Sequence, residues 1–246
     1  PDRSKKFISI FAVRRSGQHA IIDWIKLNFK GNYAFFNNVY LNTHIYYSSD
    51  HAEVHYRPFK GRKTLIYNME NPLINEHYGQ KTHPERGLGR YSQKQNIIIL
   101  RDPFNTFASY MNAKWPWDTF FNDSEEYREY IKLVWKTLAR EYLGDTNFLS
   151  DKYIINYNQW SEDEEYRKEI AQKLKLKANI ISNDAESTFG LGSSFKDSDL
   201  KNYHERWKNY RDNADYRKLF NDDELIRLSE RIFGHLQGTE SLYSVS

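Results

Sequence analysis

The stretch FISIFAVRRSGQHAIIDWIKLNF, residues 7–29, decides the fold. It opens with a short apolar run, Phe7 to Val13, that is rich in residues favouring β-structure. Its last part, from Ala20 to Phe29, carries apolar residues at helical spacing. The polar residues 14–19 interrupt both patterns. The stretch therefore predicts a strand, a tight loop and a helix in direct succession.

The predicted loop has the features of an anion-binding site. A strand, a loop and a helix in succession bring backbone N–H groups to the positive end of a helix dipole, which favours a phosphate. Gly17 allows a ligand to approach the backbone closely. The candidate phosphate-binding residues are Arg14, Arg15, Ser16, Gly17, Gln18 and His19. The plainer alternative is that Arg14 and Arg15 are surface charges on an ordinary turn.

The loop lacks the signature of nucleoside triphosphatases. That signature has two glycines separated by four residues and then Lys-[Ser/Thr], whose hydroxyl holds Mg²⁺. Residues 14–19 contain neither Gly-Lys nor that hydroxyl. An arginine-containing loop without a magnesium ligand suits a donor whose leaving group is a phosphate that a side-chain cation neutralises. Phosphosulfate meets this description, and we expect no metal at the site.

A second candidate site follows a second buried strand. Residues 96–100, Asn-Ile-Ile-Ile-Leu, form a continuous apolar run of the kind found in parallel sheets. Arg101 comes directly after this run, and Asp102 and Pro103 are typical of the start of a helix. Ser109 lies inside that helix. Arg101 and Ser109 are therefore expected to converge on a second phosphate.

The rest of the chain alternates strands with helices. Apolar runs predict strands at 64–69 and 153–157, and helical spacing predicts a helix from 124 to 143. Ser161 with Glu164 resembles a capping box that opens a further helix. The alternation predicts an α/β fold in which a central, mostly parallel sheet is flanked by helices on both faces. Ligands of such sheets bind outside the carboxyl ends of the strands.

The composition narrows the class of protein. The 246 residues show no obvious linker, so we expect a single domain spanning 1–246. A formal net charge of only +3 argues against a nucleic-acid-binding protein. Cysteine is absent, which excludes disulfides and a cysteine nucleophile and favours a cytoplasmic location. No apolar run approaches the roughly 18 residues that a membrane helix needs, so we expect no membrane segment.

The two candidate sites together resemble those of the sulfotransferases that use 3′-phosphoadenosine-5′-phosphosulfate (PAPS). In that family a strand, loop and helix bind the 5′-phosphosulfate, and an Arg…Ser pair with the spacing of Arg101 and Ser109 binds the 3′-phosphate. Residues 153–160, Tyr-Ile-Ile-Asn-Tyr-Asn-Gln-Trp, look like the family's strand ending in a Tyr-Glu-Asp-Leu-type motif. By that likeness Tyr157 approaches the adenine. A looser match covers 190–208, where the family closes a basic loop over the nucleotide.

The resemblance implies a P-loop-like nucleotide-binding architecture and an enzyme that transfers a sulfuryl group from PAPS to an acceptor hydroxyl or amine. The product nucleotide is then 3′-phosphoadenosine-5′-phosphate (PAP). Arg15 stands where the cytosolic branch of the family usually has Lys, and Gln18 and His19 replace its usual pair of hydroxyl residues. Arg cannot donate a proton at neutral pH, so we expect Arg15 to stabilise charge on the departing oxygen.

Transfer to a hydroxyl also needs a base, normally a His or a carboxylate at the acceptor oxygen. Glu70 ends the strand predicted at 64–69, close to where the family places its base, and is the first candidate. His83 is the second, because Lys81-Thr82-His83 is identical to the Lys-Thr-His of the cytosolic branch, although its flanks do not predict a strand. The plainer alternatives are a solvated strand-end carboxylate and a surface-loop histidine.

Two other functions fit parts of the pattern. A Mg²⁺-dependent kinase of the P-loop type shares the strand, loop and helix but normally uses Gly-Lys-[Ser/Thr]. A catalytically silent module would keep the nucleotide pocket without turnover. The acceptor stays open between a carbohydrate, a lipid, a small alcohol and a peptide, because the segments 33–47, 75–95 and 111–121 carry no recognisable code. No dimer motif is recognisable either.

Overall fold

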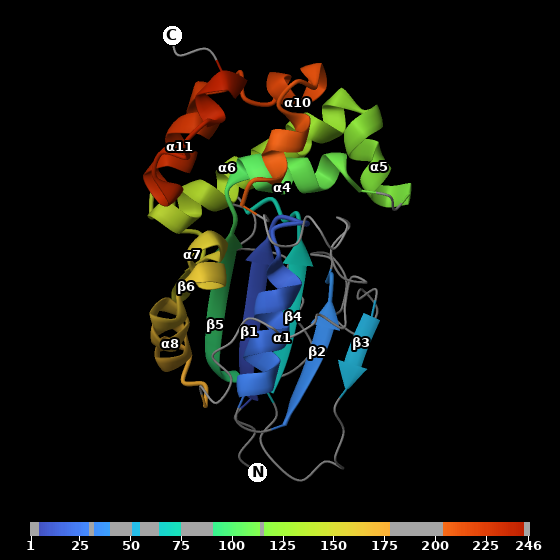
Figure 1. Ribbon diagram of the computed structural model, residues 1–246. Coiled ribbons are helices and arrows are strands. Elements are labelled where there is room, and N and C mark those ends of the chain that lie inside the picture. The colour runs from blue at the N-terminus through green and yellow to red at the C-terminus, as the bar shows by residue number, and fades with distance from the viewer. Residues whose placement is uncertain are drawn as a thin grey trace.

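One β-sheet forms the centre of this computed structural model. The structure describes residues 5–29, 32–39, 51–54, 64–74, 91–113, 116–177 and 204–243. The strands are β1 (Lys5–Ala12), β2 (Tyr33–Asn37), β3 (His51–Val54), β4 (Thr64–Glu70), β5 (Tyr91–Leu100) and β6 (Lys152–Asn156). These six strands lie in the order β3-β2-β4-β1-β5-β6 (Figure 1).

The sheet is mostly parallel, as predicted. β1 pairs in parallel with β4 on one side and with β5 on the other. β2 extends the parallel pairing beyond β4, and β6 extends it beyond β5. In the described sheet, the antiparallel pair joins β2 with β3 at one edge. The carboxyl ends of the parallel strands therefore point to one end of the sheet, where Ala12 pairs with Glu70 and Leu100 with Asn156.

Helices follow most of the strands. The α-helices are α1 (Gln18–Asn28), α4 (Pro103–Met111), α5 (Pro116–Asp123), α6 (Glu125–Leu143), α7 (Tyr157–Glu162), α8 (Glu164–Lys173), α10 (Ala214–Lys218) and α11 (Asp223–Phe233). Two 3₁₀ helices, η1 (Arg206–Tyr210) and η2 (Thr239–Leu242), lie in the C-terminal part. Figure 1 shows α1 in front of the sheet and α4, α5, α6, α10 and α11 gathered beyond the carboxyl ends of the strands.

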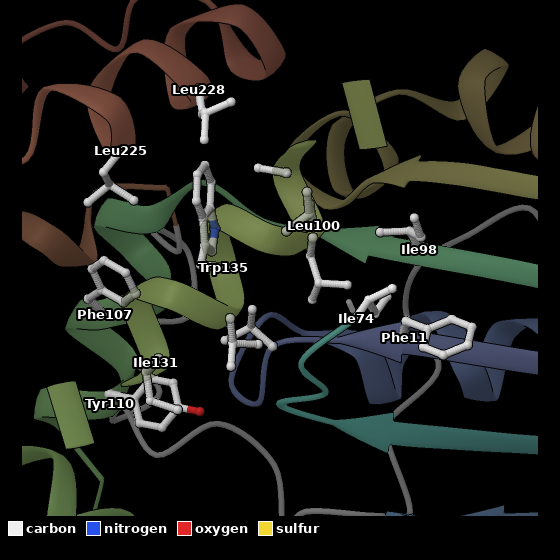
Figure 2. Close-up of a cluster of buried hydrophobic side chains, with 14 of the residues drawn as sticks. Phe11, Ile74, Ile98, Leu100, Phe107, Tyr110, Ile131, Trp135, Leu225 and Leu228 are labelled. Atoms are coloured by element: carbon white, nitrogen blue, oxygen red, sulfur yellow. The ribbon is translucent and has the colours of Figure 1, made fainter. Parts of the chain in front are cut away.

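The side chains of β1 alternate between two hydrophobic cores, because successive residues of a strand point to opposite faces. Ile8 and Ile10 pack into the core that contains α1, α7 and α8. Phe7 and Phe11 pack into the core that contains α4, α6 and α11. Figure 2 shows Trp135 of α6 amid the second core. The prediction that helices flank both faces of the sheet is confirmed.

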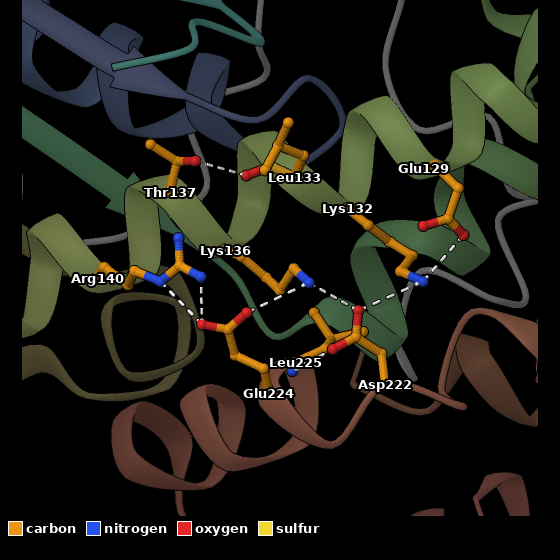
Figure 3. Close-up of polar contacts among 9 residues, drawn as sticks. All are labelled: Glu129, Lys132, Leu133, Lys136, Thr137, Arg140, Asp222, Glu224 and Leu225. Carbon is orange, nitrogen blue, oxygen red and sulfur yellow. Dashed lines mark hydrogen bonds and ion pairs between the residues drawn. The ribbon is translucent and has the colours of Figure 1, made fainter. Parts of the chain in front are cut away.

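A row of ion pairs joins α6 to α11 (Figure 3). Lys136 donates to Asp222 at 2.8 Å, and Lys132 lies 3.4 Å from the same carboxylate. One turn further along α6, Arg140 pairs with Glu224. These contacts and the apolar core fix the C-terminal helix on α6, and α6 in turn reaches the sheet's carboxyl end.

One detail differs from the sequence-based expectations. Ser161 does not open a helix; it lies inside α7. Asp163 caps α8 instead, because its carboxylate accepts the N–H of Tyr166 at 3.1 Å.

In the part of the chain that the structure describes, no helix combines the length and the apolar character that crossing a membrane requires.

Candidate functional site

The loop between β1 and α1 turns sharply because two of its residues have positive φ angles. Arg15 has a φ of 68° and Gly17 a φ of 78°. The N–H of Ser16 donates to the carbonyl of Val13 at 3.2 Å and closes the turn. A non-glycine residue at positive φ is uncommon, and such positions gather at functional sites.

The first turn of α1 is left without a side-chain cap. Gly17 occupies the N-cap position, and no acidic residue lies in the first turn. By contrast, α4 is capped by Asp102 and α6 by Ser124. The uncapped N–H groups and the helix dipole together favour an anion at this point.

Two polar atoms beside this helix start are buried without a hydrogen-bond partner in the described structure. They are the hydroxyl oxygen of Ser16 and the amide oxygen of Gln18. Both residues are only 1% exposed. Buried polar groups are normally paired, so an unpaired hydroxyl at an uncapped helix start fits a ligand that accepts its hydrogen bond. A phosphate does so.

Glu70 lies at the carboxyl end of β4 and is held by the loop and the first turn of α1. Its carboxylate accepts hydrogen bonds from Arg14 Nε at 2.5 Å and Gln18 Nε2 at 2.6 Å. His19 Nε2 lies 3.1 Å from Glu70 Oε1. The glutamate side chain is 6% exposed. Four of the predicted site residues therefore form one hydrogen-bonded cluster.

The charge state of Glu70 follows from these contacts. Burial raises the pKa of Glu70, but the hydrogen bond from His19 and the positive charge of Arg14 oppose it. The net result is a pKa below the ordinary value of 4.5. Glu70 is accordingly a carboxylate at neutral pH, which is the form that accepts a proton.

Tyr157 connects the first loop with the end of β5. A methyl group added to Gly17 would lie 2.2 Å from the ring of Tyr157, so the glycine lets the ring pack directly on the loop. The guanidinium of Arg101 lies 5.2 Å from the centre of the same ring. Gly17, Tyr157 and Arg101 thus meet at the carboxyl end of the sheet, although they come from three separate segments.

Arg101 occupies a buried position at the start of the second candidate site. It is 3% exposed, and its carbonyl accepts a hydrogen bond from Trp135 Nε1 at 3.0 Å. Asp102 caps α4 by accepting the N–H of Asn105 at 2.7 Å. Ser109 is buried on α4, and in the described part of the chain it has no hydrogen bond to another candidate residue.

Three further residues at this site were not singled out from the sequence. Asn158 Nδ2 donates to Asp102 at 2.9 Å and so joins the start of α7 to the start of α4. Asn105 Nδ2 donates to the carbonyl of His204 at 2.8 Å. His204 Nε2 lies 2.8 Å from Glu162. The signal for Asn158 was its place directly after a strand-end tyrosine; nothing local identified Asn105 or His204.

The pKa of His204 depends on the charged residues of the second site. Burial lowers the pKa of His204, Glu162 raises it, and Arg101 lowers it further, so the net pKa lies below the ordinary value. This histidine and η1 bring the C-terminal segment against α4. Most of the segment 190–208 lies outside the described residues, and only 204–208 is described.

The second candidate base cannot be placed. His83 lies in the segment 75–90, outside the described residues. Among the residues that are described, no group of three or more His, Asp or Glu side chains is arranged to hold a metal ion.

The fold is similar to that of solved sulfotransferases. The sulfotransferase domain of the Synechococcus PCC 7002 olefin synthase is 13% identical, with 96% of this chain and 98% of that chain covered and a TM-score of 0.50. Mouse sulfotransferase SULT7A1, solved in complex with PAP, is 16% identical over 92% of this chain and 88% of that chain, with a TM-score of 0.44. No protein-family model matches the sequence, and no curated protein does. The likeness to the olefin synthase domain shows that this chain has the sulfotransferase fold, an α/β architecture of the P-loop-like kind.

Proposed function

We propose that this protein is a PAPS-dependent sulfotransferase. The observation that carries the proposal is the meeting of two anion-attracting segments at one aromatic ring. The β1 loop packs on one part of Tyr157 through Gly17, and Arg101 lies over the same ring. A nucleotide with charged groups at both its 5′ and its 3′ positions suits two such segments separated by an aromatic side chain.

The chain's residues fit this donor. The unpaired Ser16 hydroxyl and the uncapped start of α1 fit the 5′-phosphosulfate, together with Arg14, Gln18 and His19. Arg101 and Ser109 are the proposed partners of the 3′-phosphate, and Tyr157 of the adenine. Bound PAPS supplies a sulfuryl group that is already activated by its phosphate leaving group.

Arg15 has the proposed role of stabilising the leaving group. Its positive φ of 68° belongs to the tight loop itself, so its backbone conformation is tied to the site. A guanidinium stays charged throughout the reaction and can balance negative charge on the departing bridging oxygen. Arg15 acts by electrostatics and does not transfer a proton.

Glu70 is the proposed general base. When an acceptor oxygen forms its bond to sulfur, the bond from sulfur to the bridging oxygen breaks, and the acceptor's proton passes to the Glu70 carboxylate. The two groups that now lower the pKa of Glu70, Arg14 and His19, belong to the residues proposed to bind the donor. A bound anion that competes for Arg14 and His19 would therefore raise the pKa of Glu70 and make it a stronger base. His83 is the alternative base.

The acceptor is a small molecule or a carbohydrate that carries a hydroxyl or amine. We place it on the side of Glu70, where β4 and β2 end. This location separates the acceptor from Arg101, which lies beyond β1 on the other side of the loop.

Calorimetry with PAP tests the proposed donor site. In EDTA, PAP should bind and ATP should bind more weakly. Arg101→Ala should weaken PAP binding about 10- to 100-fold, because hydrogen bonds to charged groups contribute about 1.5–3 kcal/mol. Arg231→Ala is the matched control, since it removes the same charge from an exposed pair with Asp145. ATP binding that requires Mg²⁺ would favour a kinase, and PAP binding without turnover across a broad acceptor panel would favour a silent module.

The pH dependence of turnover tests the base. If Glu70 is the base, the acid limb of kcat/KM reports its lowered pKa in the free enzyme, and the acid limb of kcat reports the donor complex. We expect the kcat limb to lie at the higher pH. Identical acid limbs, or an acid limb near pH 6–7 that disappears in His83→Asn, would assign the base elsewhere.

A further inference from the structure

Asn71 follows Glu70 directly and has an unusual conformation. Its φ is 55°, in the left-handed region that Asn tolerates better than most residues. Its N–H donates to the carbonyl of Ala12 at 3.0 Å. The chain just after β4 is thereby bonded to the last residue of β1, at the point where the phosphate loop begins.

The side chain of Asn71 accepts two further hydrogen bonds. Its Oδ1 accepts the backbone N–H of Arg14 at 2.8 Å and the hydroxyl of Tyr110 at 3.0 Å. Arg14 belongs to the first loop, whereas Tyr110 belongs to α4, next to Ser109. One amide oxygen therefore joins the segment proposed for the 5′-phosphosulfate to the helix proposed for the 3′-phosphate.

The backbone carbonyl of Asn71 makes a further hydrogen bond, to a second helix. It accepts the hydroxyl of Tyr130, from α6, at 2.9 Å. Asn71 thus contacts β1, the loop, α4 and α6 through four hydrogen bonds, and it is covalently joined to Glu70. A turn that needed only a residue of positive φ would not require these side-chain contacts, because glycine adopts the same conformation.

We propose that Asn71 is a positioning residue that holds the two nucleotide-binding segments and Glu70 in one geometry. The inference rests on the proposed function. Arg14 is the residue through which Asn71 acts on the first loop: its backbone is fixed by Asn71, and its side chain donates to Glu70. Tyr110 is the residue through which Asn71 acts on α4. A shift of Asn71 would therefore move both phosphate-binding segments relative to each other.

Three substitutions separate the side chain of Asn71 from its backbone conformation. Asn71→Gly keeps the positive φ but removes Oδ1. Asn71→Asp keeps an oxygen that can accept from Arg14 and Tyr110. Tyr110→Phe removes one of the two hydrogen bonds to Oδ1 and leaves the turn unchanged. It therefore tests the role of Oδ1 even if Asn71→Gly does not fold. Tyr67→Phe is the matched control, because it removes a buried hydroxyl on the same strand as Glu70 that bonds to Ser9.

The measurement is PAP affinity by calorimetry, with thermal unfolding recorded for every variant. We expect Asn71→Gly to weaken PAP binding about 10-fold, Tyr110→Phe to weaken it about 3-fold, and Asn71→Asp to stay within about 3-fold of wild type. Tyr67→Phe should lower the melting temperature without changing PAP affinity. Affinity loss that merely follows melting temperature across all four variants would overturn the inference.

The outcomes also separate this inference from the proposed function. Wild-type protein that binds no PAP would overturn both. Wild-type protein that binds PAP, together with an equally tight Asn71→Gly variant, would overturn the positioning role alone. Equal weakening in Asn71→Gly and Asn71→Asp would show that the accepting oxygen is not what matters, which also overturns it.

Discussion

Glu70 and Glu141 are two buried carboxylates with different roles. Both have a pKa below the ordinary value of 4.5, because hydrogen bonds outweigh the effect of burial in each, joined at Glu70 by nearby charge. Glu70 stands at the carboxyl end of β4, whereas Glu141 lies in the last turn of α6. The two carboxylates differ in the groups that donate hydrogen bonds to them.

Glu141 stabilises the chain that follows α6. It accepts the backbone N–H groups of Phe148 and Leu149, the hydroxyl of Thr146 and the ammonium of Lys152. Three of these partners belong to the segment that connects α6 with β6, and Lys152 is the first residue of β6. Together they satisfy the carboxylate fully. The contacts of Glu141 are therefore complete within the fold.

Glu70 has a different set of partners. They are side chains of Arg14 in the loop before α1 and of Gln18 and His19 in the first turn of α1. The unpaired Ser16 hydroxyl lies between them, at the uncapped helix start. Flexible side chains can be drawn to a ligand, but backbone N–H groups in a closed loop cannot. Burial and a lowered pKa are thus shared by both sites. The donors distinguish them: the three at Glu70 are all side chains, whereas two of the four at Glu141 are backbone N–H groups.

The largest expected effect is on enzyme activity and distinguishes Glu70 from Glu141. Glu70→Gln should lower kcat about 10²- to 10⁴-fold, the usual contribution of a general base. PAP affinity should not fall, because the carboxylate that competes with the donor for Arg14 and His19 is gone. Glu141→Gln should leave kcat per folded molecule unchanged. Both variants are measured with the acceptor found in the panel. A Glu70→Gln enzyme that retains full kcat would remove Glu70 from the chemistry.

The next-largest expected effect is on protein stability and distinguishes Glu141 from Glu70. Glu141→Gln should lower the free energy of unfolding by about 2–4 kcal/mol, because it leaves Lys152 and the backbone donors without their carboxylate. The folded-state pKa of Glu141 is lowered, so its stabilisation is present above pH 4.5 and is lost as the pH falls through the folded-state value. Urea titrations from pH 7 to about 3.5 should therefore show a flatter decline in Glu141→Gln than in wild type. Parallel declines would contradict the role assigned to Glu141.

The smallest effect compares two glycines with nearly equal φ angles. Gly17 and Gly144 have φ of 78° and 79°, so alanine at either position should cost about 1–2 kcal/mol of strain. Apart from its own chain neighbours and helix backbone, no atom of the described residues lies within 4 Å of a methyl group added at Gly144, whereas one added at Gly17 overlaps the ring of Tyr157. Gly17→Ala should therefore also weaken PAP binding about 10-fold, while Gly144→Ala leaves it unchanged. Equal PAP affinity in both variants would show that the contact between Gly17 and Tyr157 is not part of the site.

The elements that position the site were predictable because their signals are local. The apolar run before Arg14, the cap at Asp102 and the apolar run before Arg101 each lie within a few residues, and the structure confirms the strands and helices that they predict. Parallel pairing then places the ends of β1, β4 and β5 at one edge of the sheet. The meeting of these segments follows from that rule.

The contacts that complete the site could not be predicted in the same way. No local signal singles out Asn71, and its bonds to Tyr110 and Tyr130 join positions 39 and 59 residues apart. Asn105 and His204 are 99 residues apart. Such pairs depend on how α4, α6 and the C-terminal segment pack, and no local pattern of residue types encodes that packing.

The most direct test of the central claim is a ³¹P NMR titration of PAP in EDTA with wild type, Arg15→Ala and Arg101→Ala. The claim is that two separate segments each bind one phosphate of the nucleotide. Both phosphorus signals should shift on binding to wild type, and Arg101→Ala should reduce chiefly the shift of the 3′-phosphate. Arg15→Ala should reduce chiefly that of the 5′-phosphate. The absence of any shift in wild type, or equal changes of both signals in both variants, would contradict the claim.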